Sequence, residues 1–213
     1  MFDLTRFILD TSVRLPAILA ALTFHEYAHG WVADKLGDPT ARLSGRLTFN
    51  PLAHLDPIGT LALIFSPVGW AKPVPVNFSN LRNPRRDMIW VAAAGPGANL
   101  VLAAVSAWSL RLFEGAGGIS ESAWLLGLLT PLYLMLYRSV VINVALAIFN
   151  LLPLLPLDGG RVTAGLLSPR QAASYGRLER YGFPILLILI FSGAVDRVIW
   201  PPIALVAGLL LGA

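Results

Sequence analysis

The sequence contains no cysteine and few charged residues. Without cysteine the chain cannot form disulfides, thiolate metal sites or a cysteine nucleophile, so a bound metal would need histidine, aspartate or glutamate ligands. Charged residues make up only 13% of the 213 residues, well below the roughly 25% typical of soluble domains, and hydrophobic residues make up 56%. With a mean hydropathy of +0.68, this composition excludes a disordered chain and a water-soluble enzyme. It indicates a polytopic protein of the lipid bilayer.

Basic residues outnumber acidic ones, with 16 Lys and Arg against 12 Asp and Glu, which gives a net charge of +4. A pI near 9.9 would fit nucleic-acid binding only if the basic residues formed a soluble face. They instead lie at the ends of apolar runs, so we expect the lipid bilayer and no nucleic acid as partner. By the positive-inside rule, two clusters indicate the cytoplasmic side, namely Arg82, Arg85 and Arg86, and Arg161, Arg170, Arg177 and Arg180.

The apolar runs predict an all-α polytopic membrane protein with about four to six membrane segments. Two interpretations of Pro57 to Ala71 stay open, a span or a re-entrant stretch. The tail predicts a helical hairpin turned near Asp196 and Arg197, in preference to one helix kinked by Pro201 and Pro202. No linker or internal repeat divides the chain, so residues 1–213 are expected to form one domain. The expected segments are Phe7 to Val32, Pro57 to Ala71, Met88 to Leu110, Ala123 to Leu152 and Tyr181 to Ala213.

A histidine pair lies inside the first apolar segment. His25, Glu26 and His29 form an H-E-x-x-H pattern, and on a helix residues i and i+4 lie on the same face. Both imidazoles can therefore bind one Zn²⁺, with the glutamate beside the water that reacts. An accidental pattern of partly buried polar residues is the alternative. Three such residues in a membrane segment are costly unless they face a cavity or bind an ion, so the pattern favours a metal site.

A catalytic zinc ion needs a third protein ligand, and Asp158 is the main candidate. It ends an apolar run in which Pro153 and Pro156 interrupt the helix, and Gly159 and Gly160 allow the backbone to turn. The carboxylate would then project from irregular backbone inside the protein. An aspartate that caps the following helix is the alternative.

The combination of these two motifs resembles the site-2 protease family of intramembrane zinc metalloproteases. The similarity extends, in the same order, from about Leu19 to Arg161. The chain between the motifs is too short for the inserted PDZ domain of some relatives, and no cystathionine-beta-synthase domain follows the tail, so we expect a compact member. The matching segments are His25 to His29, Asn50 to Thr60, Gly69 to Asn77, Ala94 to Asn99 and Asn150 to Gly160.

The resemblance implies a role for each of five residues. His25, His29 and Asp158 would hold one Zn²⁺ per chain, and Glu26 would be the catalytic acid/base. The chemistry of these side chains agrees, because a glutamate can take a proton from the attacking water and return it to the leaving amine. Asn150 occupies the position proposed to stabilise the tetrahedral oxyanion. A helix-breaking amide that satisfies free carbonyls is the alternative for this residue.

Two further matching segments contain polar residues near the expected site. His54 is either a residue beside the site or its water path, or a solvated loop histidine. Gly95, Pro96, Gly97 and Asn99 are expected to allow a close approach of helices, with Asn99 hydrogen-bonded between them. None of these four is expected to be catalytic.

A transmembrane substrate must be unwound before its carbonyls can be attacked, because a helix keeps them in its own hydrogen bonds. We therefore expect an extended-chain binder. Arg42 to Phe49 alternates in places as a short strand pair around Gly45, and Lys72 to Val76 is an extended segment whose prolines suit an edge. Together they predict a small β element near the cytoplasmic membrane surface that binds substrate by strand addition. A loop at the interface is the alternative.

The sequence thus predicts an intramembrane zinc endopeptidase that cleaves transmembrane segments of membrane-protein substrates. We expect it in a prokaryotic cell membrane, with the active site toward the cytoplasm. Two other functions remain as alternatives. A catalytically silent scaffold or chaperone of the same fold would not need Glu26, and a metal transporter using His25, His29 and Asp158 would need neither Glu26 nor extended binding segments. The sequence leaves the oligomeric state open.

Overall fold

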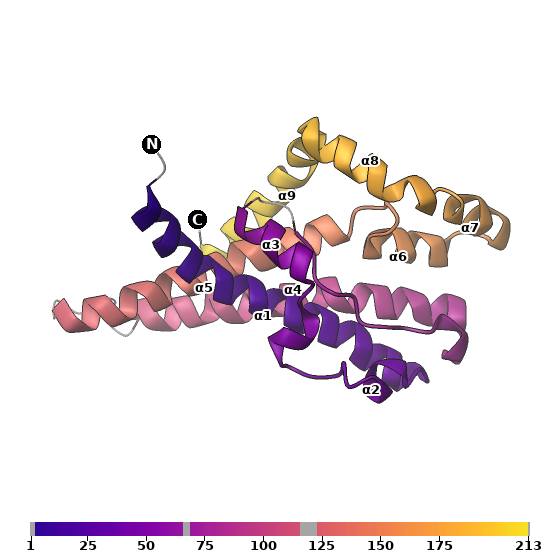
Figure 1. The fold of residues 1–213 in the computed structure, drawn as a ribbon, viewed down its shortest axis with the longest axis horizontal. Coiled ribbons are helices and arrows are strands. Elements are labelled where there is room, and N and C mark those ends of the chain that lie inside the picture. Colours follow the sequence, from indigo (N-terminus) through magenta and orange to yellow (C-terminus); the bar gives the residue numbers. More distant parts are fainter. Residues whose placement is uncertain (1–2, 66–68, 116–122, 213) are drawn as a thin grey trace.

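The computed structural model describes residues 3–65, 69–115 and 123–212, and every regular element among them is helical (Figure 1). The all-α expectation is confirmed for this part of the chain. With η denoting a 3₁₀ helix, the elements are α1 (Leu4–Leu36), α2 (Thr40–Leu43), η1 (Pro51–His54), α3 (Pro57–Phe65), η2 (Phe78–Asn80), α4 (Pro84–Gly115), α5 (Ala123–Asn150), α6 (Asp158–Leu166), α7 (Pro169–Gly176), α8 (Glu179–Phe191) and α9 (Ala194–Leu211).

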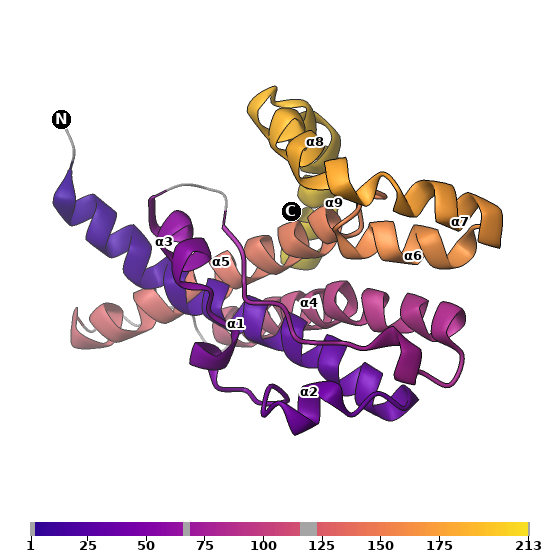
Figure 2. The same cartoon turned by 45° about the vertical axis from the view of Figure 1, so that its right-hand side comes forward.

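Three long helices, α1, α4 and α5, form the centre of the molecule, and α4 packs against both of the others. Ala103 on α4 and Val144 on α5 are fully buried and pack with Ile203 of α9. Small side chains let helices approach closely in a bilayer, where packing contributes much of their association. Figures 1 and 2 show that α6 and α7 lie together at one end of this bundle and that α8 runs from there to α9. There α6 packs against α4.

Among the described residues, four helices are long and apolar enough to cross a membrane. They correspond to three of the predicted segments and to the second half of the predicted tail hairpin. The chain therefore has the character of a multi-pass integral membrane protein, at the low end of the expected number of segments. These candidate spans are Phe7–Leu36, Pro84–Gly115, Leu129–Asn150 and Ala194–Leu211.

The predicted stretch from Pro57 to Ala71 returns to the place where it starts. Leu55 and Ala71 form an antiparallel bridge, and the Lys72 N–H donates to the His54 carbonyl at 2.9 Å. Helix α3 within the stretch has 9 residues. At about 1.5 Å per residue this is about 14 Å, half of a hydrocarbon core about 30 Å thick. The two ends of the stretch therefore lie side by side, as the re-entrant interpretation requires. Residues 66–68 fall outside the described part.

The C-terminal tail consists of two helices, α8 and α9, joined by a turn, as the hairpin interpretation requires, but the predicted position of this turn is wrong. The turn lies at Ser192 and Gly193, where Gly193 has a φ of +72°, a left-handed conformation that glycine adopts without steric cost. Asp196 and Arg197 instead belong to the start of α9, and an acidic residue in a first turn is stabilised by the helix dipole. The proline pair of the tail lies inside α9 without ending it.

The predicted small β element is wrong for the described residues, which contain no strand. Thr40–Leu43 is helix α2, and Gly45 has a φ of +66°, so the chain turns where a strand pair was expected. Lys72 to Val76 has neither helical nor strand structure, and the expected partner from Arg42 to Phe49 does not form a strand. The bridge beside α3 is the one β contact in the described residues.

Asp38, just beyond the end of α1, is fully buried and connects three chain segments. Its carboxylate accepts hydrogen bonds from the Thr40 N–H at 3.2 Å and from the Thr40 hydroxyl. It also accepts from the Asn77 N–H at 2.7 Å and from the Asn80 amide at 2.8 Å. Burial raises the pKa of Asp38, but these donors lower it by more, so its pKa lies below the ordinary value.

We expect Asp38→Asn to destabilise the fold by about 1 to 3 kcal/mol at neutral pH, because an amide donor would then face the existing donors. The wild-type advantage should be present above the unfolded-state pKa of about 4 and be lost as the pH falls through the lower pKa of the folded state. Unfolding in detergent micelles, followed by circular dichroism across this pH range, measures both effects.

Asp34→Asn is the matched control for this variant. Asp34 pairs with the exposed Arg42 at 2.9 Å, and such a surface ion pair contributes less than about 1 kcal/mol. A stability difference between wild type and Asp38→Asn that does not change with pH would contradict the role assigned to the buried carboxylate.

Candidate active site

Two of the candidate metal ligands lie one helical turn apart on α1. His25 and His29 are both buried, their rings meet edge to face, and their Nε2 atoms are 3.0 Å apart. The i, i+4 spacing on one face of α1 places the two side chains together. One helix therefore brings both imidazoles to a single point.

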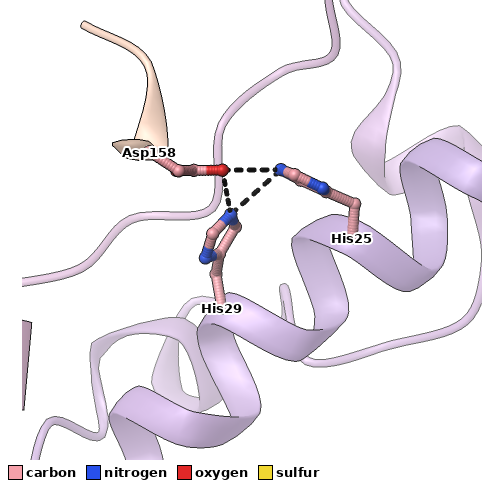
Figure 3. A group of neighbouring side chains, drawn as sticks. All are labelled: His25, His29 and Asp158. Atoms are coloured by element: carbon pink, nitrogen blue, oxygen red, sulfur yellow. Dashed lines mark hydrogen bonds and ion pairs between the residues drawn. The ribbon is translucent and has the colours of Figure 1, made fainter. Parts of the chain in front are cut away.

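The third candidate ligand, Asp158, begins α6 and points at the histidine pair (Figure 3). Its Oδ2 lies 3.2 Å from His25 Nε2 and 3.3 Å from His29 Nε2. The residue before α6 is Leu157, and no side chain caps this helix, so the capping alternative for Asp158 is excluded. The predicted meeting of two segments far apart in the sequence is confirmed.

Two glycines allow α6 to begin close to the loop that precedes it. A Cβ atom on Gly159 would overlap the carbonyl group of Leu151, and one on Gly160 would lie 2.5 Å from the nitrogen of Leu155. Neither glycine has a positive φ. Their role is therefore close approach of backbone to backbone, and not the special turn conformation that the sequence suggested.

The three ligand atoms fit a Zn²⁺ ion. Tetrahedral ligands about 2.0 to 2.1 Å from zinc lie about 3.3 to 3.4 Å from one another. The separations here are 3.0, 3.2 and 3.3 Å. Asp158 Oδ2 is buried and has no hydrogen-bond partner among residues 3–65, 69–115 and 123–212, which is costly unless a cation compensates it. A metal ion held by this oxygen and the two imidazole nitrogens would remove that cost.

Both histidine rings are oriented by hydrogen bonds on the side away from the ligand atoms. His29 Nδ1 lies 2.7 Å from the Val91 carbonyl, which can only accept, so this nitrogen is the N–H donor. His25 Nδ1 lies 2.6 Å from Asn99 Oδ1. With its proton on Nδ1, each ring presents the Nε2 lone pair toward the metal position. Asn99 also bonds to α1 and α5, which confirms the prediction that it connects helices.

Gly95 on α4 makes room for the two imidazole rings. A Cβ atom at this position would lie 2.6 Å from His25 Cε1 and 2.7 Å from His25 Nε2, and would also overlap His29 Nε2. The expected close approach of helices is confirmed at this residue. Two residues further along, a Cβ atom on Gly97 would have no atom within 4 Å.

A cavity of about 480 Å³ opens at the ligand group. Glu26 and Asn150, the two residues predicted to act in catalysis, both line it. Glu26 Oε2 accepts a hydrogen bond from the Val74 N–H at 2.7 Å, and the Asn150 amide donates to the Leu146 carbonyl at 3.0 Å. Both residues therefore line the same cavity as the ligand group, and their catalytic roles stay predictions.

The segment from Lys72 to Val76 borders this cavity and makes a contact that the sequence analysis missed. Because Pro73 and Pro75 have no N–H, Val74 has the single backbone donor of these three residues, and that donor is used by Glu26. The Pro-Val-Pro pattern is the sequence signal for this arrangement, since it isolates one N–H in an extended chain.

His54 lies outside the ligand group, and the alternative of a solvated loop histidine is wrong. The side chain is 1% exposed, so it is not solvated, and it does not line the cavity among the described residues. Its Nε2 donates to the Thr48 carbonyl at 2.8 Å, while its own carbonyl accepts from the Lys72 N–H. His54 therefore connects the loop before α3 to the segment that borders the cavity.

The model of peptidase family M50 matches residues 14–193, which include all three candidate ligands. A Bacillus subtilis protein named "Putative zinc metalloprotease YwhC" is 39% identical over 184 residues, which cover 86% of this chain and 82% of that protein. "Putative zinc metalloprotease Rip2" of Mycolicibacterium smegmatis is 26% identical over 188 residues, and the match covers 84% of this chain but only 66% of Rip2. Rip2 of Mycobacterium tuberculosis has the same identity and coverage. No solved structure matches the chain significantly.

We expect Gly95→Ala to lower the affinity for zinc by at least about 10-fold, because the added methyl group would overlap both imidazole rings. Zinc content per chain after purification in detergent, followed by competition with a chelator, measures the change. Gly97→Ala is the matched control on the same helix, and it should keep the wild-type zinc content. An unchanged zinc affinity in Gly95→Ala would contradict the close approach described here.

Proposed function

The chain belongs to peptidase family M50, the site-2 protease family of zinc metalloproteases, and from this membership we propose that it hydrolyses peptide bonds in or near the transmembrane segments of other membrane proteins. His25, His29 and Asp158 are its metal-binding group. The observation that carries the proposal is the position of Glu26. This carboxylate follows the first ligand on a candidate membrane span and lines the same cavity as all three ligands.

The side chains in this cavity support a hydrolytic reaction. Bound zinc supplies Lewis-acid activation of a water nucleophile and of the scissile carbonyl. Glu26 takes a proton from the attacking water and returns it to the leaving amine. Asn150 presents an amide in the cavity wall with one N–H donated to Leu146. In this proposal its second N–H stabilises the developing oxyanion.

The remaining cavity wall supports a substrate from the bilayer. Away from the ligands it is mostly apolar, and α8 contributes Phe183, Leu186, Leu187 and Ile190. An apolar wall of this kind accepts the side chains of a transmembrane segment, which a polar cleft would reject. The substrate class in this proposal is therefore an apolar segment that has been unwound at the site of cleavage.

The segment beside Glu26 supports binding of an extended backbone. An unwound substrate lying along Lys72 to Val76 would place a carbonyl on the Val74 N–H, as in strand addition. The Glu26 carboxylate, which now accepts that N–H at 2.7 Å, would then be free to accept a proton. Substrate binding would therefore break the hydrogen bond between Val74 and Glu26 and make the Glu26 carboxylate available as the base.

The proposal includes a cytoplasmic orientation of the cleft in a prokaryotic cell membrane. Arg85 and Arg86 stand in the first turn of α4, and Arg161 lines the cavity three residues after Asp158. Positively charged residues at the ends of membrane helices favour the cytoplasmic side. Cleavage at this side would release the cytoplasmic part of a substrate.

We expect Glu26→Gln to lower proteolysis by about 100- to 10,000-fold and to leave zinc bound, because the amide cannot take a proton but does not remove a ligand. The assay is cleavage of a single-span model substrate reconstituted with the full chain in liposomes. Glu114→Gln is the matched control. Glu114 lies at the C-terminal end of α4, away from Gly95 and the histidines, and accepts a hydrogen bond from the Tyr133 hydroxyl, so this variant should keep full activity.

The same liposomes test the alternative functions. Zinc flux without cleavage would identify a transporter, and zinc binding without either activity would identify a silent scaffold. Either result would overturn the proposed protease function, as would cleavage that continues unchanged in Glu26→Gln.

A further inference from the structure

A chain of buried polar side chains runs from the metal group into the interface of α4 and α5. Asn99 on α4 and Asn143 on α5 are fully buried, and Ser106 and Ser139 are nearly so, at 4% and 8% exposed. These four residues lie on helices long and apolar enough to span a membrane. Polar groups are costly there, so each needs a partner and each has one.

A backbone carbonyl determines which atom of Asn143 donates and which accepts in this series of hydrogen bonds. Asn143 Nδ2 lies 2.8 Å from the Ser139 carbonyl, which can only accept a hydrogen bond. The NH₂ group of Asn143 must therefore face Ser139. Its Oδ1 consequently faces α4, where it lies 2.8 Å from Asn99 Nδ2.

The same argument fixes the direction of the Asn99 amide. Its Nδ2 has two acceptors, Asn143 Oδ1 and the Ala21 carbonyl at 3.1 Å, and these use both of its hydrogens. Asn99 Oδ1 must then face His25 Nδ1 at 2.6 Å. Since an amide oxygen only accepts, His25 carries its proton on Nδ1 and keeps Nε2 unprotonated for the metal.

We propose that Asn143 is a positioning residue for the metal site, which acts through Asn99 to fix the ring orientation and tautomer of His25. The two histidines differ in this respect. His29 is held directly by the Val91 backbone carbonyl, whereas His25 depends on two side-chain amides. Loss of Asn143 leaves one hydrogen of Asn99 without an acceptor in an apolar interface, so the amide is no longer held in a single orientation.

The inference rests on the proposed metal function of the site, and it is tested by metal binding, without proteolysis. The variant is Asn143→Leu in the full chain purified in detergent. Zinc affinity is measured by chelator competition, and the visible absorption spectrum of the Co²⁺-loaded protein reports ligand geometry. We expect zinc affinity to fall by about 10-fold, the lower end of the effect of residues that orient a metal ligand, together with a changed Co²⁺ spectrum.

Two further variants separate positioning from packing. Ser106→Ala removes a buried hydroxyl that lies 2.8 Å from Ser139 Oγ, in the same interface but without a role in directing Asn99, and it should bind metal like the wild type. Asn143→Asp keeps an acceptor toward Asn99 and should restore most of the zinc affinity. Wild-type affinity and spectrum in Asn143→Leu, or an equal loss in Ser106→Ala, would overturn the proposal.

A measurement on the wild type keeps the proposal testable if Asn143→Leu does not fold. Nitrogen-15 NMR of the histidine side chains in the zinc-loaded protein should show the proton of His25 on Nδ1 and coordination through Nε2. Coordination through Nδ1, or a zinc-bound His25 without a proton on Nδ1, would overturn it. A wild type that binds no zinc in any of these assays would instead remove the proposed function itself, together with this inference.

Discussion

Two imidazole nitrogens and one carboxylate oxygen meet in a buried place, and no donor in the described part of the chain hydrogen-bonds to the carboxylate oxygen, Asp158 Oδ2. His25 and His29 approach with their Nε2 lone pairs, and Asp158 Oδ2 lies within 3.3 Å of both. Such a cluster is unfavourable by itself, because like electron-rich atoms repel each other and the carboxylate has lost its water. A divalent cation converts this repulsion into attraction. The packing of α1, α4 and α6 is thus organised around one electrostatic requirement.

The helices meet this requirement through residues that take up little space. Gly95 leaves room on α4 for both rings, while Gly159 and Gly160 let α6 begin against the preceding loop. Polar residues then set directions: backbone and side-chain acceptors on α4 keep each imidazole proton away from the metal position. On α4, one residue makes room for the imidazole rings and two others orient them: Gly95 lacks a side chain, and Val91 and Asn99 accept the Nδ1 hydrogens.

The sequence was informative wherever the signal was local. The i, i+4 histidine pair, the apolar runs and the isolated aspartate before two glycines follow from helix geometry and from the cost of burying charge. The small β element was predicted from alternation in Arg42 to Phe49 and from the extended segment Lys72 to Val76. It failed because helix α2 forms at Thr40–Leu43 and the chain turns at Gly45, so the extended segment has no partner strand. Asn143 carried no signal at all, since one amide in an apolar helix does not reveal which distant side chain it faces.

The isolated donor at Val74 has a consequence for inhibitor chemistry. A peptide mimic that imitates a long β-strand gains few extra contacts here, because the Lys72 N–H, two residues before Val74, is already donated to the His54 carbonyl. A compact compound needs only a group that chelates the metal ion and one hydrogen-bond acceptor placed for the Val74 N–H. Its selectivity would then come from how well its apolar body fills the wall formed by α8.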